Sequence, residues 1–197
     1  AAEATSEFGV GSSGSRLLSG NHVLAEALEA EIAAFKRTPS AIVFASGYAA
    51  NVGAIPALVG RDDLILSDEL NHASIIDACR LSRAETRVYP HRDAGAAAAI
   101  LRSERQPFRR ALIVTDGVFS VDGDVAPLPE LCDIAEQYDA GLYIDDAHGV
   151  GVLGDGGRGS VSHFGLAGRE PIIEMGTLSK ALGSLGGYVA GSQAVVD

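Results

Sequence analysis

The sequence predicts an α/β fold in which helices cover both faces of a mostly parallel sheet. Short runs of apolar residues recur along the chain, as expected for strands that are buried on both faces. Between most of these runs lie longer segments whose apolar residues recur every three or four positions, which is the spacing of an amphipathic helix. This alternation of strands and helices is typical of parallel sheets.

The first 21 residues are rich in Gly and Ser, and we expect residues 1–21 to form a loop. In 24–35 the apolar residues recur at intervals of four, four and three, which predicts a helix. Pro39 ends this helix because proline cannot continue it. The next residues, 41–44, are all apolar and predict a buried strand.

The rest of the chain repeats the same alternation. Further strands are expected at 64–66, 87–89, 111–114, 141–144, 171–173 and 188–190. Further helices are expected at 72–81, 94–105 and 128–138. A glycine-rich stretch follows the strand at 141–144 and predicts turns or close backbone approaches. We therefore expect one domain over residues 22–197.

The composition excludes several classes of function. The formal net charge of -11 argues against a nucleic-acid partner or an anionic membrane surface, because both need clustered Lys and Arg. No apolar run is long enough to span a bilayer, and no signal-peptide pattern is found. Cys79 and Cys132 form no CxxC pair and predict reduced, buried thiols. We expect a cytoplasmic protein.

Ligands of parallel sheets bind beyond the carboxyl ends of the strands, so the residues after each strand are the candidates for chemistry. Gly47 and Tyr48 follow the first strand and precede a helix-like run. Their backbone N–H groups could hold a phosphate and the ring could stack on a flat ligand, or the segment could be a plain turn. His72 begins a predicted helix, where a histidine is either structural or a ligand contact.

Two acids and a histidine, Asp145, Asp146 and His148, follow the strand at 141–144. Burying carboxylates at the end of a strand costs free energy, so we expect them to have a binding or catalytic role that offsets this cost. The group could bind a metal, orient a base or pair with a heterocyclic cation.

Lys180 follows another predicted strand in a setting of small and apolar residues. A partly desolvated lysine is a candidate nucleophile for a Schiff base. Thr177 and Ser179 place hydroxyls beside it that can hold a phosphate. With an acid for a ring nitrogen and an imidazole for stacking, these residues form the set that pyridoxal 5'-phosphate (PLP) requires.

Two other motifs are set aside. Residues 9–14 fit the dinucleotide pattern G-x-G-x-x-G, but no convincing strand precedes them and no helix opens on them. Residues 115–124 contain three acids and two glycines, but their spacing does not fit an EF-hand loop. We expect no metal site.

Four ordered motifs resemble the α-oxoamine synthases, a family of fold-type I PLP enzymes. They are Leu-Asn-His-Ala-Ser-Ile at 70–75, Asp-Gly-Val-Phe-Ser-Val-Asp-Gly-Asp at 116–124, Asp-Asp-Ala-His-Gly-Val-Gly at 145–151 and Thr-Leu-Ser-Lys-Ala-Leu-Gly at 177–183. The resemblance runs from about Gly11 to the end of the chain. It implies the large, PLP-binding domain of a fold-type I transferase.

The resemblance also implies a role for each matching residue. Lys180, His72 and Asp145 would be catalytic: Lys180 forms the Schiff base and later transfers a proton, His72 stacks on the ring, and Asp145 pairs with the pyridine nitrogen. The other cofactor contacts would come from the phosphate-binding and oxygen-binding positions of the family, namely Gly47, Tyr48, Ser120, His148 and Thr177. Asp146 matches the motif without being a usual direct ligand.

Members of this family condense an amino acid with an acyl-CoA or other acyl thioester and release CO2. The motif at 145–151 with its glycine-rich continuation most resembles the branch that uses alanine and a pimeloyl thioester in biotin synthesis, while branches that use glycine or serine stay open. The resemblance implies a homodimer and a C-terminal small domain that this chain lacks. Two alternatives remain, namely a fold-type I lyase that needs no acyl-CoA and an inactive fragment that keeps the fold.

Overall fold

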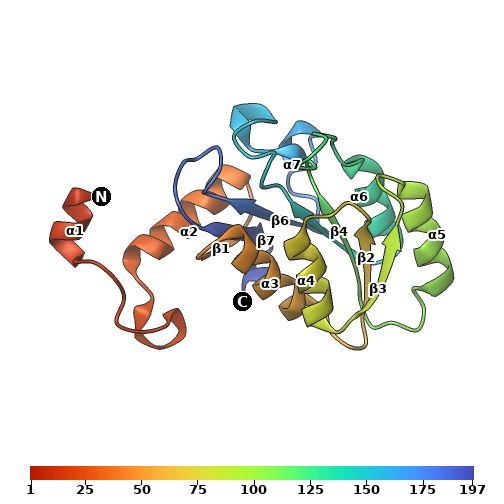
Figure 1. Cartoon of the computed structure of the whole chain (residues 1–197), viewed down its shortest axis with the longest axis horizontal. Coiled ribbons are helices and arrows are strands. Elements are labelled where there is room, and N and C mark those ends of the chain that lie inside the picture. The colour runs from red at the N-terminus through yellow and green to blue at the C-terminus, as the bar shows by residue number, and fades with distance from the viewer.

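The computed structural model describes residues 1–197, and its centre is a sheet of seven strands between two layers of helices (Figure 1). The strand order is β1-β7-β6-β5-β4-β2-β3. Strands β2 to β6 run parallel to their neighbours in this group, whereas β7 runs antiparallel to both β6 and β1. The predicted α/β fold with a mostly parallel sheet is confirmed.

The strands are β1 Ser40–Phe44, β2 Leu64–Asp68, β3 Glu85–Tyr89, β4 Ala111–Asp116, β5 Gly141–Asp145, β6 Ile172–Thr177 and β7 Gly187–Gly191. The α-helices are α1 Ala2–Phe8, α2 Val23–Lys36, α3 Gly47–Leu58, α4 Ala73–Ser82, α5 Ala94–Glu104, α6 Leu128–Gln137, α7 Ser160–His163 and α8 Gln193–Val196. A π-helical turn, Arg16–Gly20, and a 3-10 turn, Asp155–Gly157, complete the set.

The central strands are buried on both faces because alternate side chains enter two separate cores. In β5, Leu142 and Ile144 pack in the core beneath α5 and α6, and Tyr143 packs in the core beneath α3 and α4. A third, smaller core lies between α2 and strands β1 and β7. This arrangement explains why the strands read as continuous apolar runs in the sequence.

Three expectations about local structure need correction. The segment 1–21 is not a loop throughout, because it contains α1 and the π-helical turn. Strand β1 is only half-buried, since it is an edge strand whose one partner is β7. Strand β6 continues to Thr177, beyond the apolar run that predicted it, and carries the charged side chain of Glu174 in a buried position.

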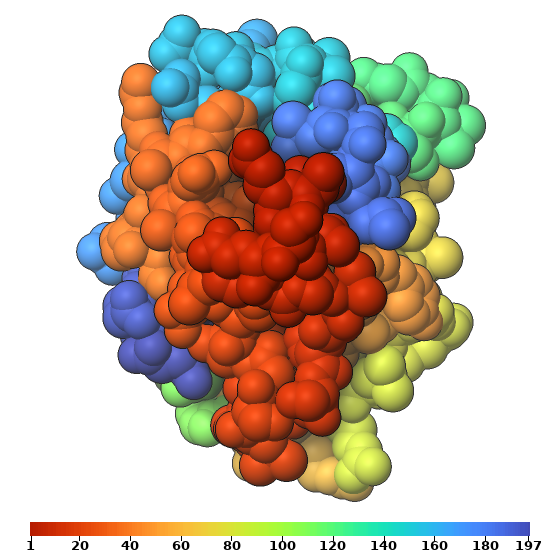
Figure 2. All heavy atoms as spheres, turned by 90° about the vertical axis from the view of Figure 1, so that its left-hand side faces the viewer, coloured from red at the N-terminus to blue at the C-terminus, as the bar shows by residue number.

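The first twenty residues project from the domain beyond the start of α2, and they face the viewer in the turned view (Figures 1 and 2). None of the side chains in α1 or in the π-helical turn is buried. Leu17 and Leu18 are 93% and 84% exposed, respectively. This segment therefore presents apolar side chains outward from the described fold.

A buried ionic cluster fastens the end of α2 to the sheet. The Lys36 ammonium lies 2.5 Å from Glu174 Oε2 and 3.5 Å from Asp146 Oδ2, and all three side chains are almost fully buried. Lys36 also donates to the carbonyl of Arg158 at 2.5 Å. Burial raises the pKa of Glu174 to about 7 even though Lys36 opposes the shift. One cation thus serves two carboxyl groups.

The glycine-rich stretch encloses the carboxylate of Asp146. A Cβ placed on Gly149 would lie 2.1 Å from Asp146 Oδ1, and one on Gly159 would lie 1.7 Å from Asp146 Oδ2. The backbone N–H of Ser160 donates to both oxygens, at 3.2 and 3.0 Å. Glycine is therefore required at positions 149 and 159, because any side chain there would collide with the buried Asp146 carboxylate.

Both cysteines are buried and unpaired, as predicted. The longest helix has 14 residues, and no helix of the structure is long and apolar enough to cross a membrane. No group of three or more His, Cys, Asp or Glu side chains is arranged to hold a metal ion.

Candidate active site

A cavity of about 180 Å³ lies at the carboxyl ends of the parallel strands. Asp116, Asp145 and Thr177 are the last residues of β4, β5 and β6, and Asp116 stands beside Asp145 in the register of the sheet. The cavity is lined by Ser46, Gly47, Tyr48, His72, Ser74, Asp116, Asp145, Ala147, His148, Met175, Thr177, Ser179 and Lys180. A larger cavity of about 760 Å³ is lined by none of the predicted site residues.

Seven of the eight predicted cofactor contacts therefore line one cavity, although they are spread from position 47 to position 180 in the sequence. The exception is Ser120, which is exposed in the turn after Phe119 and is not part of the lining. The structure does not bring the Ser120 hydroxyl into the lining of this cavity, and a cofactor contact of Ser120 stays a prediction.

Asp145 is buried at the base of the cavity. Its Oδ2 accepts a hydrogen bond from Asn51 Nδ2 at 2.7 Å, and its Oδ1 accepts one from the backbone N–H of Ala147 at 3.1 Å. Burial raises the pKa of Asp145, while the hydrogen bonds from Asn51 and Ala147 and the charge of Lys180 oppose this shift. A cation in the cavity would therefore gain a carboxylate partner in a low-dielectric setting.

Asp116 is a second acid in the same cavity. Burial, followed by the neighbouring charge of Asp145, raises the pKa of Asp116 to about 8. Like charges on adjacent strand ends disfavour joint ionisation, so one of the two carboxyl groups carries the proton near neutral pH. Asp116 Oδ2 accepts a hydrogen bond from the backbone N–H of His72 at 2.8 Å.

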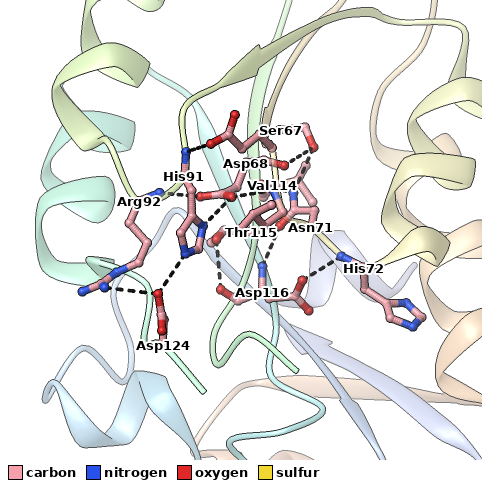
Figure 3. A network of polar contacts seen from close by, with 12 residues as sticks. Ser67, Asp68, Asn71, His72, His91, Arg92, Val114, Thr115, Asp116 and Asp124 are labelled. Atoms are coloured by element: carbon pink, nitrogen blue, oxygen red, sulfur yellow. Dashed lines mark hydrogen bonds and ion pairs between the residues drawn. The ribbon is translucent and has the colours of Figure 1, made fainter. Parts of the chain in front are cut away.

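A polar network behind the cavity holds the backbone that carries His72 (Figure 3). The buried Asn71 amide donates to Ser67 Oγ at 2.9 Å and to the carbonyl of Val114 at 2.8 Å, and it accepts from the N–H of Asp116 at 2.9 Å. Both N–H groups and the oxygen of the Asn71 amide therefore have hydrogen-bond partners on β2 or β4. The start of α4 is thereby fixed against the ends of two strands.

The same network includes His91, which lies between two carboxylates. Its Nδ1 is 2.9 Å from Asp68 Oδ1 and its Nε2 is 3.1 Å from Asp124 Oδ2 (Figure 3). Phe119 packs edge-on against its ring at 4.4 Å between centroids. Burial lowers the pKa of His91, but the hydrogen bonds to Asp68 and Asp124 outweigh burial and leave it raised.

Two further groups of different charge face the cavity. Lys180 is exposed and its ammonium makes no hydrogen bond or ion pair, so the expectation of a partly desolvated lysine is not met in this chain. His148 is half-buried, and burial followed by the charge of Lys180 lowers its pKa. His148 is therefore a neutral imidazole at physiological pH, able to donate from one nitrogen and accept at the other.

The N-terminus of α3 offers an anion-binding surface at the cavity. Ser46 caps this helix by accepting from the N–H of Ala49 at 3.0 Å. The N–H groups of Gly47 and Tyr48 come next and have no intrahelical partner, as is usual for the first turn. Thr177 faces them from β6, with its Oγ1 3.5 Å from the position of a Cβ on Gly47. Unpaired N–H groups at a helix N-terminus are a common phosphate site.

Sequence reasoning missed three residues of the site: Asn51, Ser74 and Asp116. Asn51 and Ser74 are buried polar residues on otherwise apolar helix faces, and that pattern was the available signal. Asp116 belongs to a motif that carries the family resemblance and was also weighed as a cation loop, but no role was assigned to Asp116 itself. Their roles depend on contacts between distant parts of the chain.

The comparisons with known proteins agree with this geometry. A family model described as aminotransferase class I and II matches residues 1–197. A putative 8-amino-7-oxononanoate synthase from Trichormus variabilis is 56% identical over 197 residues, covering 100% of this chain and 51% of the relative. An 8-amino-7-oxononanoate synthase from Symbiobacterium thermophilum is 52% identical, covering 99% of this chain and 50% of the relative. The chain thus spans about half the length of these curated relatives.

Solved structures show the same fold. A serine palmitoyltransferase from S. paucimobilis with bound PLP–myriocin aldimine superposes with a TM-score of 0.91 at 35% identity, covering 98% of this chain and 49% of that one. An 8-amino-7-oxononanoate synthase from Francisella tularensis gives a TM-score of 0.82 at 31% identity, covering 99% and 53%. Both enzymes are α-oxoamine synthases of PLP fold type I, so the resemblance in the sequence motifs is confirmed. The chain belongs to the aminotransferase class I and II family.

Proposed function

We propose that this cavity binds pyridoxal 5'-phosphate and that Lys180 forms the covalent bond to it. One observation carries the proposal: a single cavity brings together an unpaired lysine amine, a buried carboxylate and the N-terminus of a capped helix. These are the groups that an aldehyde, a pyridine nitrogen and a phosphate require. The PLP-bound serine palmitoyltransferase supports the same assignment by its likeness to this chain.

The residues present fit the cofactor because polar groups of the right kind are left without protein partners. The Lys180 amine has none, and neither do the N–H groups of Gly47 and Tyr48. Asp116 uses only one of its two carboxyl oxygens in a hydrogen bond. Thr177 adds a hydroxyl beside the helix N-terminus.

When bound, the cofactor supplies an electron sink for negative charge that develops at the α-carbon of an amino acid. Asp145 holds a proton at the pyridine nitrogen, since an ionised carboxylate in a buried position favours a neighbouring cation. His148, as a neutral imidazole, is the donor for an oxygen anion on the ring. The Lys180 amine, once free, is the base that moves a proton at the α-carbon.

The proposed reaction of the whole protein is decarboxylative condensation of an amino acid with an acyl thioester, an acyltransferase reaction. The relatives named 8-amino-7-oxononanoate synthase favour alanine and a pimeloyl thioester, carried by CoA or an acyl carrier protein, in biotin synthesis. A substrate screen has three alternative outcomes. They are glycine with acetyl-CoA, as in 2-amino-3-ketobutyrate CoA ligase, serine with palmitoyl-CoA, as in serine palmitoyltransferase, and glycine with succinyl-CoA, as in 5-aminolevulinate synthase.

We further propose a cytoplasmic homodimer with no nucleic-acid or membrane partner. The net charge of -11 supports the absence of those partners. The exposed leucines of the N-terminal segment, Leu17 and Leu18, support a second subunit as their cover. Sedimentation of the complete protein with and without residues 1–20 tests this assembly.

The cofactor proposal has a sharp chemical test because the chain has only two lysines, Lys36 and Lys180. Lys36 is held in the buried ionic cluster, so a cofactor aldehyde has one accessible lysine side chain in this chain. The complete protein is incubated with PLP, reduced with borohydride and digested. We expect a visible absorption band and a stable label on Lys180, and we expect both to vanish in Lys180→Ala.

The substrate proposal is tested separately. Alanine, glycine and serine are each offered with pimeloyl-, acetyl-, palmitoyl- and succinyl-CoA and without any acyl-CoA. Product only with alanine and the pimeloyl thioester supports the main proposal, whereas turnover without acyl-CoA points to a lyase. A label on Lys180 with no turnover of any pair supports an inactive protein that keeps the fold.

A further inference from the structure

A buried asparagine joins two of the proposed catalytic residues. Asn51 Nδ2 is 2.7 Å from Asp145 Oδ2 and 2.8 Å from Ser74 Oγ. Asn51 Oδ1 is 2.9 Å from the hydroxyl of Tyr143. Ser74 Oγ is in turn 2.7 Å from His72 Nδ1. A continuous hydrogen-bonded chain therefore runs from Asp145 to the ring of His72.

The charge of Asp145 helps to raise the pKa of Asp116 to about 8, so Asp116 carries the proton that the two acids share near neutral pH and Asp145 is the ionised partner. An ionised carboxylate can only accept, so the Asn51 NH2 group faces Asp145 Oδ2. The second hydrogen of that NH2 group then points to Ser74 Oγ. Burial raises the pKa of Tyr143 well above its usual value, so its hydroxyl keeps its proton and donates to Asn51 Oδ1. All hydrogen-bonding groups of the buried amide are satisfied in this orientation only.

The same reasoning fixes the proton on the next residue. Ser74 Oγ accepts from Asn51, so its own hydrogen is free to donate to His72 Nδ1. The backbone N–H of Ser74 points at the same nitrogen from 3.2 Å. Two donors meet at Nδ1, which must therefore carry a lone pair, and the ring proton is left on Nε2.

From this order we propose that Ser74 and Asn51 are positioning residues that hold His72 as the neutral Nε2–H tautomer and tie its ring to Asp145. The proposal deepens the proposed PLP site and depends on it for its catalytic meaning. Neither residue carries a charge, and both are buried, Asn51 completely and Ser74 at 1% exposure, although Ser74 also borders the cavity. They act through His72 and Asp145, whose ring and carboxylate they orient.

The arrangement also explains why His72 has a defined ring orientation although the residue is exposed. Its backbone N–H is held by Asp116 at 2.8 Å, and its ring is held by Ser74 through Nδ1. Fixing one ring nitrogen by a neighbouring group is the usual way in which a protein selects the tautomer of a histidine. The Nε2–H edge is then the only free polar group of the ring.

The test is nitrogen NMR of the complete protein labelled with 15N-histidine, with the His72 signal assigned by its loss in His72→Gln. The wild-type protein should show a pyridine-type Nδ1 and a pyrrole-type Nε2 for His72. In Ser74→Ala the ratio of the two tautomers should move towards Nδ1–H by roughly fivefold, the effect of one lost hydrogen bond. Ser74→Thr, which keeps the hydroxyl, should restore the wild-type pattern.

Ser82→Ala is the matched control, because Ser82 is a buried serine in the same helix whose hydroxyl bonds only to backbone groups. It should leave the His72 signals unchanged. An Nδ1–H ring in the wild-type protein overturns the proposal, and this outcome does not depend on the folding of any variant. Equal tautomer ratios in wild type and Ser74→Ala also overturn it.

The proposed function fails in a different way. If borohydride leaves no label on Lys180 while His72 shows the expected tautomer and responds to Ser74→Ala, the hydrogen-bonded chain stands and the cofactor assignment falls. If the label forms and the tautomer is wrong, the cofactor assignment stands and the roles of Ser74 and Asn51 fall.

Discussion

Replacement of Lys36 by methionine should destabilise the protein strongly at alkaline pH and much less at acidic pH. Methionine keeps an unbranched side chain that is only one atom shorter, and it removes the one cation that faces Asp146 and Glu174. Both carboxyl groups are buried, and the Lys36 charge lowers the pKa of each against the larger effect of burial. Without the cation, two buried acids must share a site with no compensating charge.

The size of the effect follows from the pKa of Glu174. With Lys36 present, that pKa is already raised from 4.5 to about 7. Keeping the group ionised at pH 8 therefore costs about 3 kcal/mol, at about 1.4 kcal/mol for each tenfold change in proton affinity. Loss of the cation raises this cost further, and removing one partner of a buried ion pair typically costs about 3–5 kcal/mol.

The sign of the pH dependence is fixed by the direction of the shift. A carboxyl group with a raised folded pKa is favourable when protonated, so its stabilisation is present below 4.5 and is lost as the pH rises through the folded value. Lys36→Met raises that folded value. The variant should therefore approach the wild type near pH 5 and fall furthest below it near pH 8.

Urea unfolding of the complete protein, followed by far-UV circular dichroism, measures this effect at both pH values. Arg80→Met is the control, because Arg80 also lies in the last turn of a helix but pairs with Asp77 at the surface. Such exposed pairs contribute about 0–1 kcal/mol. Adding Glu174→Gln to Lys36→Met should recover part of the loss. A loss in Lys36→Met no larger than in Arg80→Met, or one independent of pH, would refute the reasoning.

Three further outcomes are expected. Gly159→Ala should unfold the protein or cost more than about 3 kcal/mol, since its Cβ would meet a buried carboxylate. Gly165→Ala, which has open space and also a positive φ, should cost about 1 kcal/mol in thermal unfolding. His91 forms a clamp, namely the hydrogen bonds of its ring to Asp68 and Asp124. Because the pKa of His91 is raised in the folded protein, the clamp is complete below pH 6.5 and weakens as the pH rises through the pKa of folded His91. Hydrogen-exchange protection of 119–124 should fall over that range in the wild type, and a pH-independent protection would contradict the clamp, as would the same fall in a His91→Gln variant. Asp145→Asn should keep the borohydride label and lose at least about 100-fold in kcat, because an amide cannot hold a proton at the ring nitrogen; near-normal turnover would argue against that role.

The parts of the fold that the sequence predicts correctly are those in which local pattern and burial agree. Strand β5 is an apolar run buried on both faces, and the residues after it had to reach the ligand edge of a parallel sheet. This rule marks Asp145 and His148 as candidates, and the family resemblance supplies their predicted roles. Helix α1 was missed although it contains good helix formers, because none of its side chains is buried and its pattern shows no apolar face.

The features of the site that the sequence does not predict have a common physical cause. Ser120 sits in a turn whose path depends on the clamp around His91, which is 29 positions earlier and unrecognisable from local sequence. Asn51 acts through Asp145 and Tyr143, more than 90 positions away. Glu174 breaks the apolar pattern of β6 because its partner, Lys36, comes from a helix near the start of the chain. Polar pairs of this kind leave no periodic signal.

Helix α3 contributes to both ends of the cavity. Its first turn carries the free N–H groups of the anion-binding surface, and Asn51, which bonds to Asp145, follows one turn later. The rise of an α-helix sets these two points about 6 Å apart along its axis. The helix is therefore a rigid spacer between the anion-binding end and the buried acid of the cavity. A displacement of α3 would move both recognition points together, so the distance between them stays constant. We therefore expect the cavity to select ligands by the distance between their anionic and cationic groups.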